Sequence, residues 1–287
     1  MSLTRVHLIV LALGLPLACS AANLSVPKQV AANSEVALST SGSGNATLIV
    51  VGPGHASKQT VHLGDTVTLK GDAIRYAGRY VAVLKSSDGN ASADFFVTAA
   101  APASISFLAQ PSRVPADRRE AISGTAFVLD KNDNLVMTTT PVKFQLAVPG
   151  TAPATRVEQS KDGVAWVRMN SGKREGAAQF VAGTGNISTA RVVQQVAAEP
   201  CNLRMTAQHD KDGILVETDP IRDCSGNPVP DGTIVTFSQL DDQGKTTVDA
   251  RIKRGIARAE LPGARKATIS VASGVVVGNE INWRGGE

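Results

Sequence analysis

The stretch Asp223–Phe237, DCSGNPVPDGTIVTF, is the second copy of a pattern that the chain carries 93 residues earlier at Asp130–Phe144, DKNDNLVMTTTPVKF. Both copies begin with Asp, place Asn at the fifth position and end on Val-x-Phe. The Asp, Asn, Gly and Pro residues predict a turn, since they accept the backbone angles that turns require. The alternating apolar residues that follow predict a strand with one buried face. The chain is therefore predicted to contain a tandem repeat.

The sequence around these stretches keeps the repeat in register except at predicted loops. Ala99–Ala103 and Val196–Cys201, which both set a Pro shortly after an Ala pair, match at an offset of 98 residues, and Gly163–Ala165 matches Gly255–Ala257 at 92. Loops tolerate insertions, whereas the core sets the strand lengths. Two homologous β-sandwiches are therefore predicted, with short Ala/Pro linkers that favour a stiff row of domains.

The region before the repeat is predicted to be a further sandwich. Short apolar runs alternate with turn clusters such as Ser41–Asn45 and Ser87–Asn90, which indicates about seven strands. The stretch Ala77–Val83 resembles the tyrosine corner of immunoglobulin-like domains, in which Tyr80 donates its hydroxyl back to the backbone. Ala82 stands where antibody domains place their second Cys, so this domain is expected to lack that bridge.

The fold class follows from composition as well as from the repeat. Val, Thr, Ile, Gly and Asn are frequent, and no long apolar pattern has helical spacing. Aromatic residues make up only 4% of the chain, so each core is expected to contain one or two rings. The prediction is an all-β tandem array of three immunoglobulin-like β-sandwich domains after a signal peptide. The predicted boundaries are residues 1–22 for the signal peptide and 23–100, 101–197 and 198–287 for the three domains.

Residues 101–287 resemble two bacterial immunoglobulin-like domains of the invasin/intimin type, often called group 1. The resemblance rests on the Asp…Asn-x-Val turn, the Val-x-Phe strand, the elements Asp162–Ala165 and Arg254–Ala257, and the closing Val-Ala strands. It implies extracytoplasmic rods that space or present binding tips, and it carries no catalytic residues. The first domain joins the resemblance only through its tyrosine corner.

The N-terminus predicts export. Arg5, the apolar run Val6–Leu17 and the small residues that follow have the arrangement of a secretory signal, and the run is shorter than the roughly 20 residues that span a bilayer. Leu15–Cys19 also resembles a lipoprotein signal, in which Cys19 would carry the lipid. Cleavage after Ala21 or Ala22 is equally available. Both outcomes stay open, with the soluble product slightly favoured, and the location is the periplasm, the cell surface or the medium.

The two downstream cysteines, Cys201 and Cys224, are predicted to form a disulfide, since disulfides persist in exported proteins. The equivalent positions in the second domain are Ala103 and Lys131, so this disulfide is predicted for the third domain and not for the second. Loop-entropy reasoning assigns it a stabilisation of about 3 kcal/mol. The alternative is a pair of buried free thiols.

The remaining rings are predicted to organise the cores. Phe144 and Phe237 occupy equivalent positions in the repeat and are expected at the centres of their sandwiches. Alternation on one strand face alone would also fit a surface pocket.

No constellation in the sequence predicts catalysis, a cofactor or a metal. The loop that begins at Asp130 has oxygen ligands at alternate positions, but an EF-hand would need Gly and Glu where Leu135 and Pro141 stand. An Asx-rich turn that satisfies its own backbone is favoured over calcium. The middle domain has eleven basic and seven acidic residues between positions 101 and 195, too weak an excess to predict nucleic-acid binding.

The predicted function is that of a non-enzymatic cell-envelope or secreted protein that acts as a spacer, adhesion or protein-interaction module. Its expected partner is an unidentified envelope protein or surface polymer. One alternative is a carbohydrate-binding module, which is disfavoured because sugar platforms usually need exposed rings and the sequence offers only Trp166, Trp283 and two Tyr residues. A hydrolase built on a β-sandwich is the other.

Overall fold

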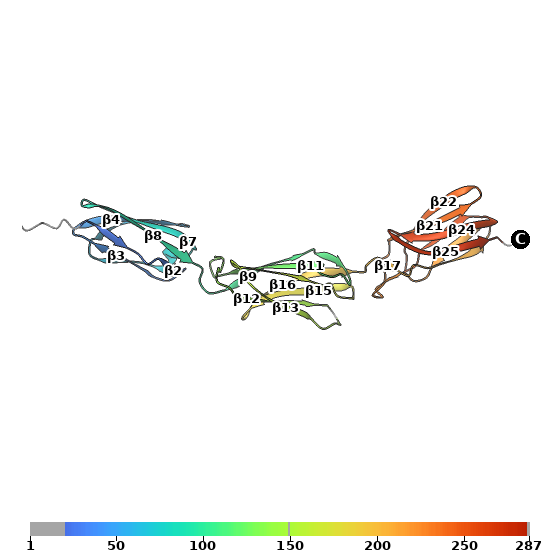
Figure 1. The fold of residues 1–287 in the computed structure, drawn as a ribbon, viewed down its shortest axis with the longest axis horizontal. Coiled ribbons are helices and arrows are strands. Elements are labelled where there is room, and N and C mark those ends of the chain that lie inside the picture. The colour runs from blue at the N-terminus through green and yellow to red at the C-terminus, as the bar shows by residue number, and fades with distance from the viewer. Residues whose placement is uncertain (1–20, 149, 286–287) are drawn as a thin grey trace, which may run out of the picture. The chain divides into compact units, whose positions relative to one another are not determined.

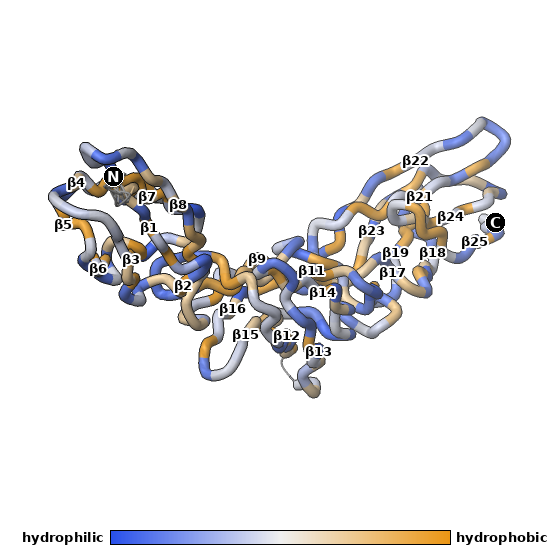
Figure 2. Tube along the Cα trace, turned by 60° about the vertical axis from the view of Figure 1, so that its left-hand side comes forward, coloured by the Kyte–Doolittle hydropathy of each residue, from blue (hydrophilic) through white to orange (hydrophobic). Residues whose placement is uncertain are grey.

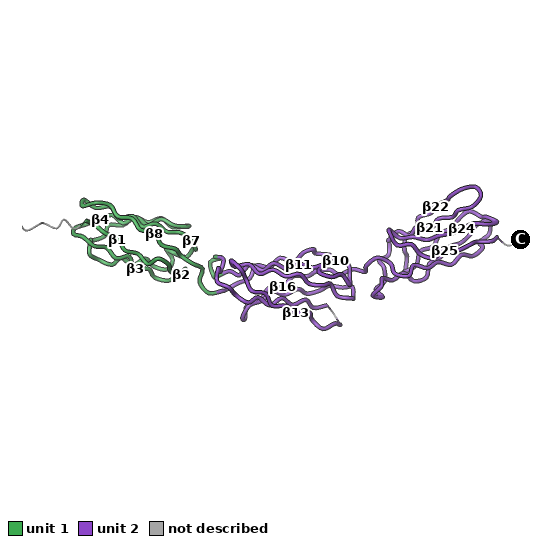
Figure 3. Tube along the Cα trace, viewed as in Figure 1, with its two compact units in different colours: residues 1–101, 130–134 green, residues 102–129, 135–287 purple. Residues whose placement is uncertain are grey.

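The computed structural model describes residues 21–148 and 150–285 (Figure 1). The predicted signal peptide, apart from its last two residues, and Cys19 lie outside the described residues. Strands dominate the described part, with one 3-10 turn, η1 (Gly71–Ile74). The chain forms two compact units, residues 1–101 with Asp130–Asn134 and residues 102–129 with 135–287 (Figure 3).

The first unit contains one sandwich of two sheets. One sheet has the strand order β1-β3-β6 and the other has the order β2-β8-β7-β4-β5. The strands are β1 (Asn23–Ser25), β2 (Gln29–Ala31), β3 (Val36–Ser41), β4 (Asn45–Gly52), β5 (His55–His62), β6 (Thr66–Leu69), β7 (Gly78–Ser86) and β8 (Gly89–Thr98).

Tyr80 is fully buried in this sandwich and stacks on Phe95, with ring centroids 5.4 Å apart. Its hydroxyl lies 3.1 Å from the carbonyl of Tyr76 and 3.3 Å from that of Pro53, so it donates back to the backbone as the tyrosine corner predicts. A Cβ atom at Gly52 would stand 2.2 Å from the Tyr80 ring, which explains why the neighbouring strand has glycine there.

The second sandwich, in the second unit, has the sheets β14-β11-β9 and β10-β16-β15-β12-β13. Its strands are β9 (Ser104–Gln110), β10 (Arg113–Pro115), β11 (Ile122–Leu129), β12 (Pro141–Ala147), β13 (Ala154–Gln159), β14 (Val164–Met169), β15 (Gly176–Thr184) and β16 (Ile187–Val196). Its core contains Phe107, Phe144 and Phe180, all fully buried, with ring centroids 5.0 to 6.2 Å apart.

The third sandwich, in the same unit, has the sheets β18-β19-β23 and β22-β21-β24-β25, with the small pair β17-β20 at its start. Phe237 on β21 is fully buried in its core. The strands are β17 (Pro200–Cys201), β18 (Met205–Asp210), β19 (Gly213–Thr218), β20 (Arg222–Asp223), β21 (Ile234–Asp241), β22 (Gly244–Arg251), β23 (Arg258–Pro262), β24 (Lys266–Ser273) and β25 (Val276–Arg284).

Buried residues alternate with exposed ones on β3 and mostly with half-buried ones on β11 and β24. Figure 2 shows the apolar residues following the strands, with hydrophilic residues at many of the turns. This alternation places one face of each sheet in a core and the other in solvent. The predicted all-β class with immunoglobulin-like sandwiches is confirmed.

Candidate functional site

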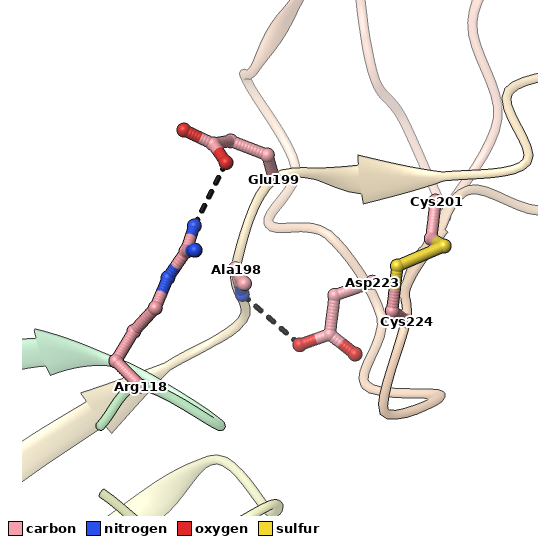
Figure 4. A network of polar contacts seen from close by, with 6 residues as sticks. All are labelled: Arg118, Ala198, Glu199, Cys201, Asp223 and Cys224. Atoms are coloured by element: carbon pink, nitrogen blue, oxygen red, sulfur yellow. Dashed lines mark hydrogen bonds and ion pairs between the residues drawn. A yellow bond between two sulfur atoms is a disulfide. The ribbon is translucent and has the colours of Figure 1, made fainter. Parts of the chain in front are cut away.

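The second copy of the Asp…Asn turn forms a network of buried hydrogen bonds at the start of the third sandwich. The Asp223 carboxylate, only 4% exposed, accepts four hydrogen bonds. One oxygen accepts from the backbone N–H groups of Ser225 and Asn227, both at 2.9 Å. The other accepts from the Asn227 side chain at 2.8 Å and from the N–H of Ala198 at 3.0 Å (Figure 4). Because Ala198 lies in the linker, this turn ties the third sandwich to the chain that enters it.

Asn227 extends the same network to the second sandwich. Its side-chain NH₂ donates to the carbonyl of Lys173 at 2.7 Å, and its Oδ1 accepts from the N–H of Glu175 at 3.1 Å. The loop Lys173–Glu175 immediately precedes β15. Asn227 thus forms hydrogen bonds with the backbone at both ends of this loop of the preceding sandwich, in addition to those within its own turn.

The first unit contains the same arrangement. Asp130, 1% exposed, accepts from the N–H of Ala100 at 2.9 Å. Asn134 donates to the carbonyl of Arg75 at 2.7 Å and accepts from the N–H of Ala77 at 2.7 Å. Lys173 and Glu175 come 98 residues after Arg75 and Ala77, so the two networks are equivalent. The sequence predicted a turn that satisfies its own backbone and missed these outside partners. The one available signal was that Asp and Asn recur together, at the same spacing, in both copies of the repeat.

The electrostatics of the two carboxylates follow from these contacts. Burial by itself would raise the pKa of Asp130 and of Asp223. The hydrogen bonds from the Asn side chain and from three backbone N–H groups favour the charged form and outweigh burial, so the pKa of each Asp lies below its usual range.

We expect these networks to weaken in acid. A carboxylate whose pKa is lower in the folded than in the unfolded state contributes stability that is complete above the unfolded pKa of about 3.9. That stability disappears as the pH falls through the lower folded-state pKa. Urea unfolding of the full chain between pH 7 and pH 2 measures this loss. In the double variant Asp130→Asn, Asp223→Asn the dependence should be flatter, and an unchanged dependence would contradict the assignment.

The disulfide lies beside this network. Cys201 on β17 and Cys224, which follows β20, are bonded, with their Cα atoms 4.9 Å apart. Arg118 of the second sandwich forms a 2.8 Å ion pair with Glu199 of the linker, but both side chains are about half exposed or more, so the pair adds little stability. The disulfide itself holds β17, the strand that follows the linker, against the turn that carries Asp223 (Figure 4).

Removal of the bridge is expected to destabilise the third sandwich. The double variant Cys201→Ser, Cys224→Ser should lose about 3 kcal/mol of unfolding free energy, because the unfolded chain regains the freedom of a loop of roughly 25 residues. Denaturant unfolding of oxidised parent and variant measures the difference. Reduction of the parent should reproduce the effect, and equal stability of reduced and oxidised parent would contradict it.

Other candidate chemistry remains dispersed. Within residues 21–148 and 150–285, no group of three or more His, Cys, Asp or Glu side chains is placed to hold a metal ion. In that same part of the chain no helix has the length and apolar character needed to cross a bilayer.

The two tryptophans have opposite environments. Trp283 is only 8% exposed, and its indole N–H lies 3.2 Å from the carbonyl of Ala264. Trp283 is therefore not available as an exposed ring for a sugar platform, because its side chain packs in the third core. Trp166 on β14 is 54% exposed and remains available at the surface.

No protein-family profile and no curated protein matches the sequence, but solved structures share its fold. FdeC, an Escherichia coli adhesin, is 16% identical and aligns over 96% of this chain and 100% of its own, with a TM-score of 0.60. Invasin, described as a bacterial integrin-binding protein, is 11% identical over 90% of this chain and 58% of its own, with a TM-score of 0.51. InvD of Yersinia pseudotuberculosis is 12% identical over 94% and 97%, with a TM-score of 0.51. The predicted resemblance to invasin/intimin-type immunoglobulin-like domains is confirmed at the level of the fold.

Proposed function

We propose that this chain, whose sandwiches share the fold of bacterial invasin-type proteins, is an exported, non-enzymatic spacer, adhesion or interaction module of the cell envelope or the medium. Support comes from the adhesin and invasin structures that share the fold, and from the predicted signal at residues 1–22. The partner is a protein or surface polymer outside the cytoplasm.

The observation that carries the proposal is the joint between the second and third sandwiches. Asp223 accepts a hydrogen bond from the linker, and Asn227 forms two hydrogen bonds with the loop before β15. The disulfide holds the first short strand of the third sandwich. A protein that only needed to tether two domains would have no use for buried, satisfied polar contacts at their junction, since loose linkers suffice for that. Restraint at a joint serves a module that must present a distant domain in a defined orientation.

Asn227→Ala should loosen this joint without unfolding either sandwich. The N–H of Glu175 loses its acceptor and should exchange with solvent at least about tenfold faster, equivalent to roughly 1.4 kcal/mol of lost protection. Hydrogen exchange of the full chain measures it. Asn279→Ala is the matched control, because Asn279 makes the same pair of hydrogen bonds to Met205 inside the third sandwich. Equal exchange of the Glu175 amide in all three proteins would contradict the joint.

Cell fractionation tests the proposed location and role. The tagged full-length chain should be found in the periplasm, at the surface or in the medium, and a variant lacking residues 2–22 should stay inside the cell. Cross-linking in intact cells should then recover envelope or surface partners with the first protein and not with the second. Retention of the full-length chain in the cytoplasm would overturn the proposal.

A further inference from the structure

The outer face of the sheet β14-β11-β9 carries an unusual row of side chains. Trp166, Thr125 and Leu108 stand opposite one another across its three strands. Trp166 is 54% and Leu108 is 51% exposed, whereas the neighbouring residues Ala165 and Phe107 are buried. An exposed tryptophan beside an exposed leucine loses hydrophobic stabilisation that burial would provide, so this row calls for an explanation beyond the fold.

The corresponding row of the third sandwich is charged and satisfied internally. On β23-β19-β18 it consists of Arg258, Glu217 and Thr206. The Arg258 and Glu217 side chains form an ion pair with each other. On the first sandwich the outward residues of the matching sheet include Ser25, Ser39 and Thr66. Three sheets of one design therefore differ at this face, and only the middle one exposes an aromatic ring there.

A row of polar side chains lies beside the Trp166 row on the same face of the sheet. It consists of Arg168, Ser123 and Gln110, and the Ser123 hydroxyl donates to the Gln110 carbonyl at 3.1 Å. Arg168 lies with its guanidinium carbon 5.5 Å from the centre of the Trp166 ring. Among the described residues Arg168 has no carboxylate within ion-pair distance, and neither it nor the Gln110 side chain makes a hydrogen bond.

These groups border a shallow open depression of about 820 Å³, lined by Gln110, Ser112, Glu120, Ser123 and Arg168 among others. That volume lies in the range of small-ligand sites, about 300–1,000 Å³. The depression thus contains the Arg168 guanidinium, a carboxamide, hydroxyl groups and the Glu120 carboxylate. Arg168, which lies over the Trp166 ring, connects the depression to the exposed indole beside it.

From this arrangement we infer that the face binds an anionic saccharide, with one sugar ring stacked on Trp166 and its carboxylate or sulfate group on Arg168. The inference rests on the proposed function, whose surface polymer it specifies. The face of an indole ring is electron-rich and attracts the weakly positive C–H groups of a pyranose. A guanidinium offers a planar fork of donors that matches carboxylate and sulfate oxygens. Gln110 and Ser123 supply donors and acceptors for hydroxyl groups.

A saccharide fits this face better than a protein partner does. Polar side chains with few hydrogen-bond partners lie close to the Trp166 ring, where a protein interface would have apolar ones. A protein interface centres on a wide apolar core with a polar rim. On this sheet a single row holds the large exposed apolar side chains, and the guanidinium of Arg168, which has no carboxylate partner among the described residues, lies over the Trp166 ring. The basic excess of this domain, eleven basic against seven acidic residues between positions 101 and 195, favours an anionic ligand over a neutral one.

A glycan array probed with the full chain tests the inference, with uronic-acid, sialylated, sulfated and neutral glycans as separate arms. Binding should concentrate on the anionic arms, and which of them binds distinguishes carboxylate from sulfate. Trp166→Ala should lower the affinity at least about tenfold for every bound glycan. Arg168→Gln should lower it about tenfold for the anionic glycan and leave that for its neutral analogue unchanged.

Val192→Ala is the matched control, because Val192 is 64% exposed on the opposite sheet of the same sandwich. It should bind like the parent. Absence of binding to any anionic glycan, or binding unaffected by Trp166→Ala, overturns the inference. If the chain instead captures a protein through Trp166, the saccharide inference falls and the proposed function stands. Retention in the cytoplasm would remove the proposed function whatever the array shows.

Discussion

Phe144→Ala is expected to lower the unfolding free energy of the second sandwich by about 3–5 kcal/mol, because the truncation leaves a cavity that the rigid sheets cannot close. Phe144 is fully buried between Phe107 and Phe180, whose ring centroids lie 6.0 and 6.2 Å away. Small domains have only about 5–15 kcal/mol of stability in total. This one substitution should therefore bring the sandwich close to unfolding.

Hydrogen exchange resolved by strand measures the effect in the full chain. Protection should fall across β12, β15 and β9 and persist in the first sandwich. Val157→Ala is the control, since Val157 is 58% exposed on β13 of the same sheet and should cost little. If the amides of the Phe144→Ala variant are protected from exchange as well as those of the parent, the assignment of Phe144 to the core is wrong.

Phe237→Ala tests the equivalent core position in the third sandwich. It also removes a fully buried ring, but the disulfide limits the freedom of the unfolded third sandwich. We expect a smaller visible loss than for Phe144→Ala in oxidised protein and a comparable loss after reduction. A loss independent of the redox state would contradict this account.

Asp223→Ala is the second large effect, with an expected cost of about 3–4 kcal/mol. The variant leaves four hydrogen-bond donors without their acceptor, from Ala198, Ser225 and the backbone and side chain of Asn227. Each donor that stays buried and unpaired costs about 1–3 kcal/mol, and water that enters the turn recovers part of the sum. The turn holds the linker and orients Asn227, so the joint should loosen as well.

Chemical denaturation and the exchange rate of the Glu175 amide measure the two consequences. Asp231→Ala is the control, because Asp231 also accepts two backbone N–H groups but lies exposed, where water replaces lost partners. It should cost far less than Asp223→Ala. Equal costs for Asp223→Ala and Asp231→Ala would show that burial of the turn contributes nothing.

Much of the fold could be predicted because its causes are local. A period of two in apolar residues identifies a strand and the face it buries, and this holds for Phe144 and Phe237. The same alternation also indicates which of the two tryptophans is exposed, and the prediction did not use it. Trp166 alternates with the buried residues Ala165 and Val167 and so points outward, whereas Trp283 shares its strand face with Ile281 and points inward.

The residues alone were enough to predict the all-β class, the repeat, the tyrosine corner around Tyr80 and the disulfide. Backbone angles and side-chain alternation depend on residues close together in the chain, and the disulfide prediction followed from the predicted export. The outside partners of Asp130, Asn134, Asp223 and Asn227 became apparent only in the folded structure. Their partners lie up to 59 residues away in sequence, in the loop that precedes the tyrosine-corner strand of one sandwich and in its counterpart in the next. A hydrogen bond between two loops that lie far apart in the sequence depends on the folded arrangement of the chain, and no local pattern of residues records that geometry.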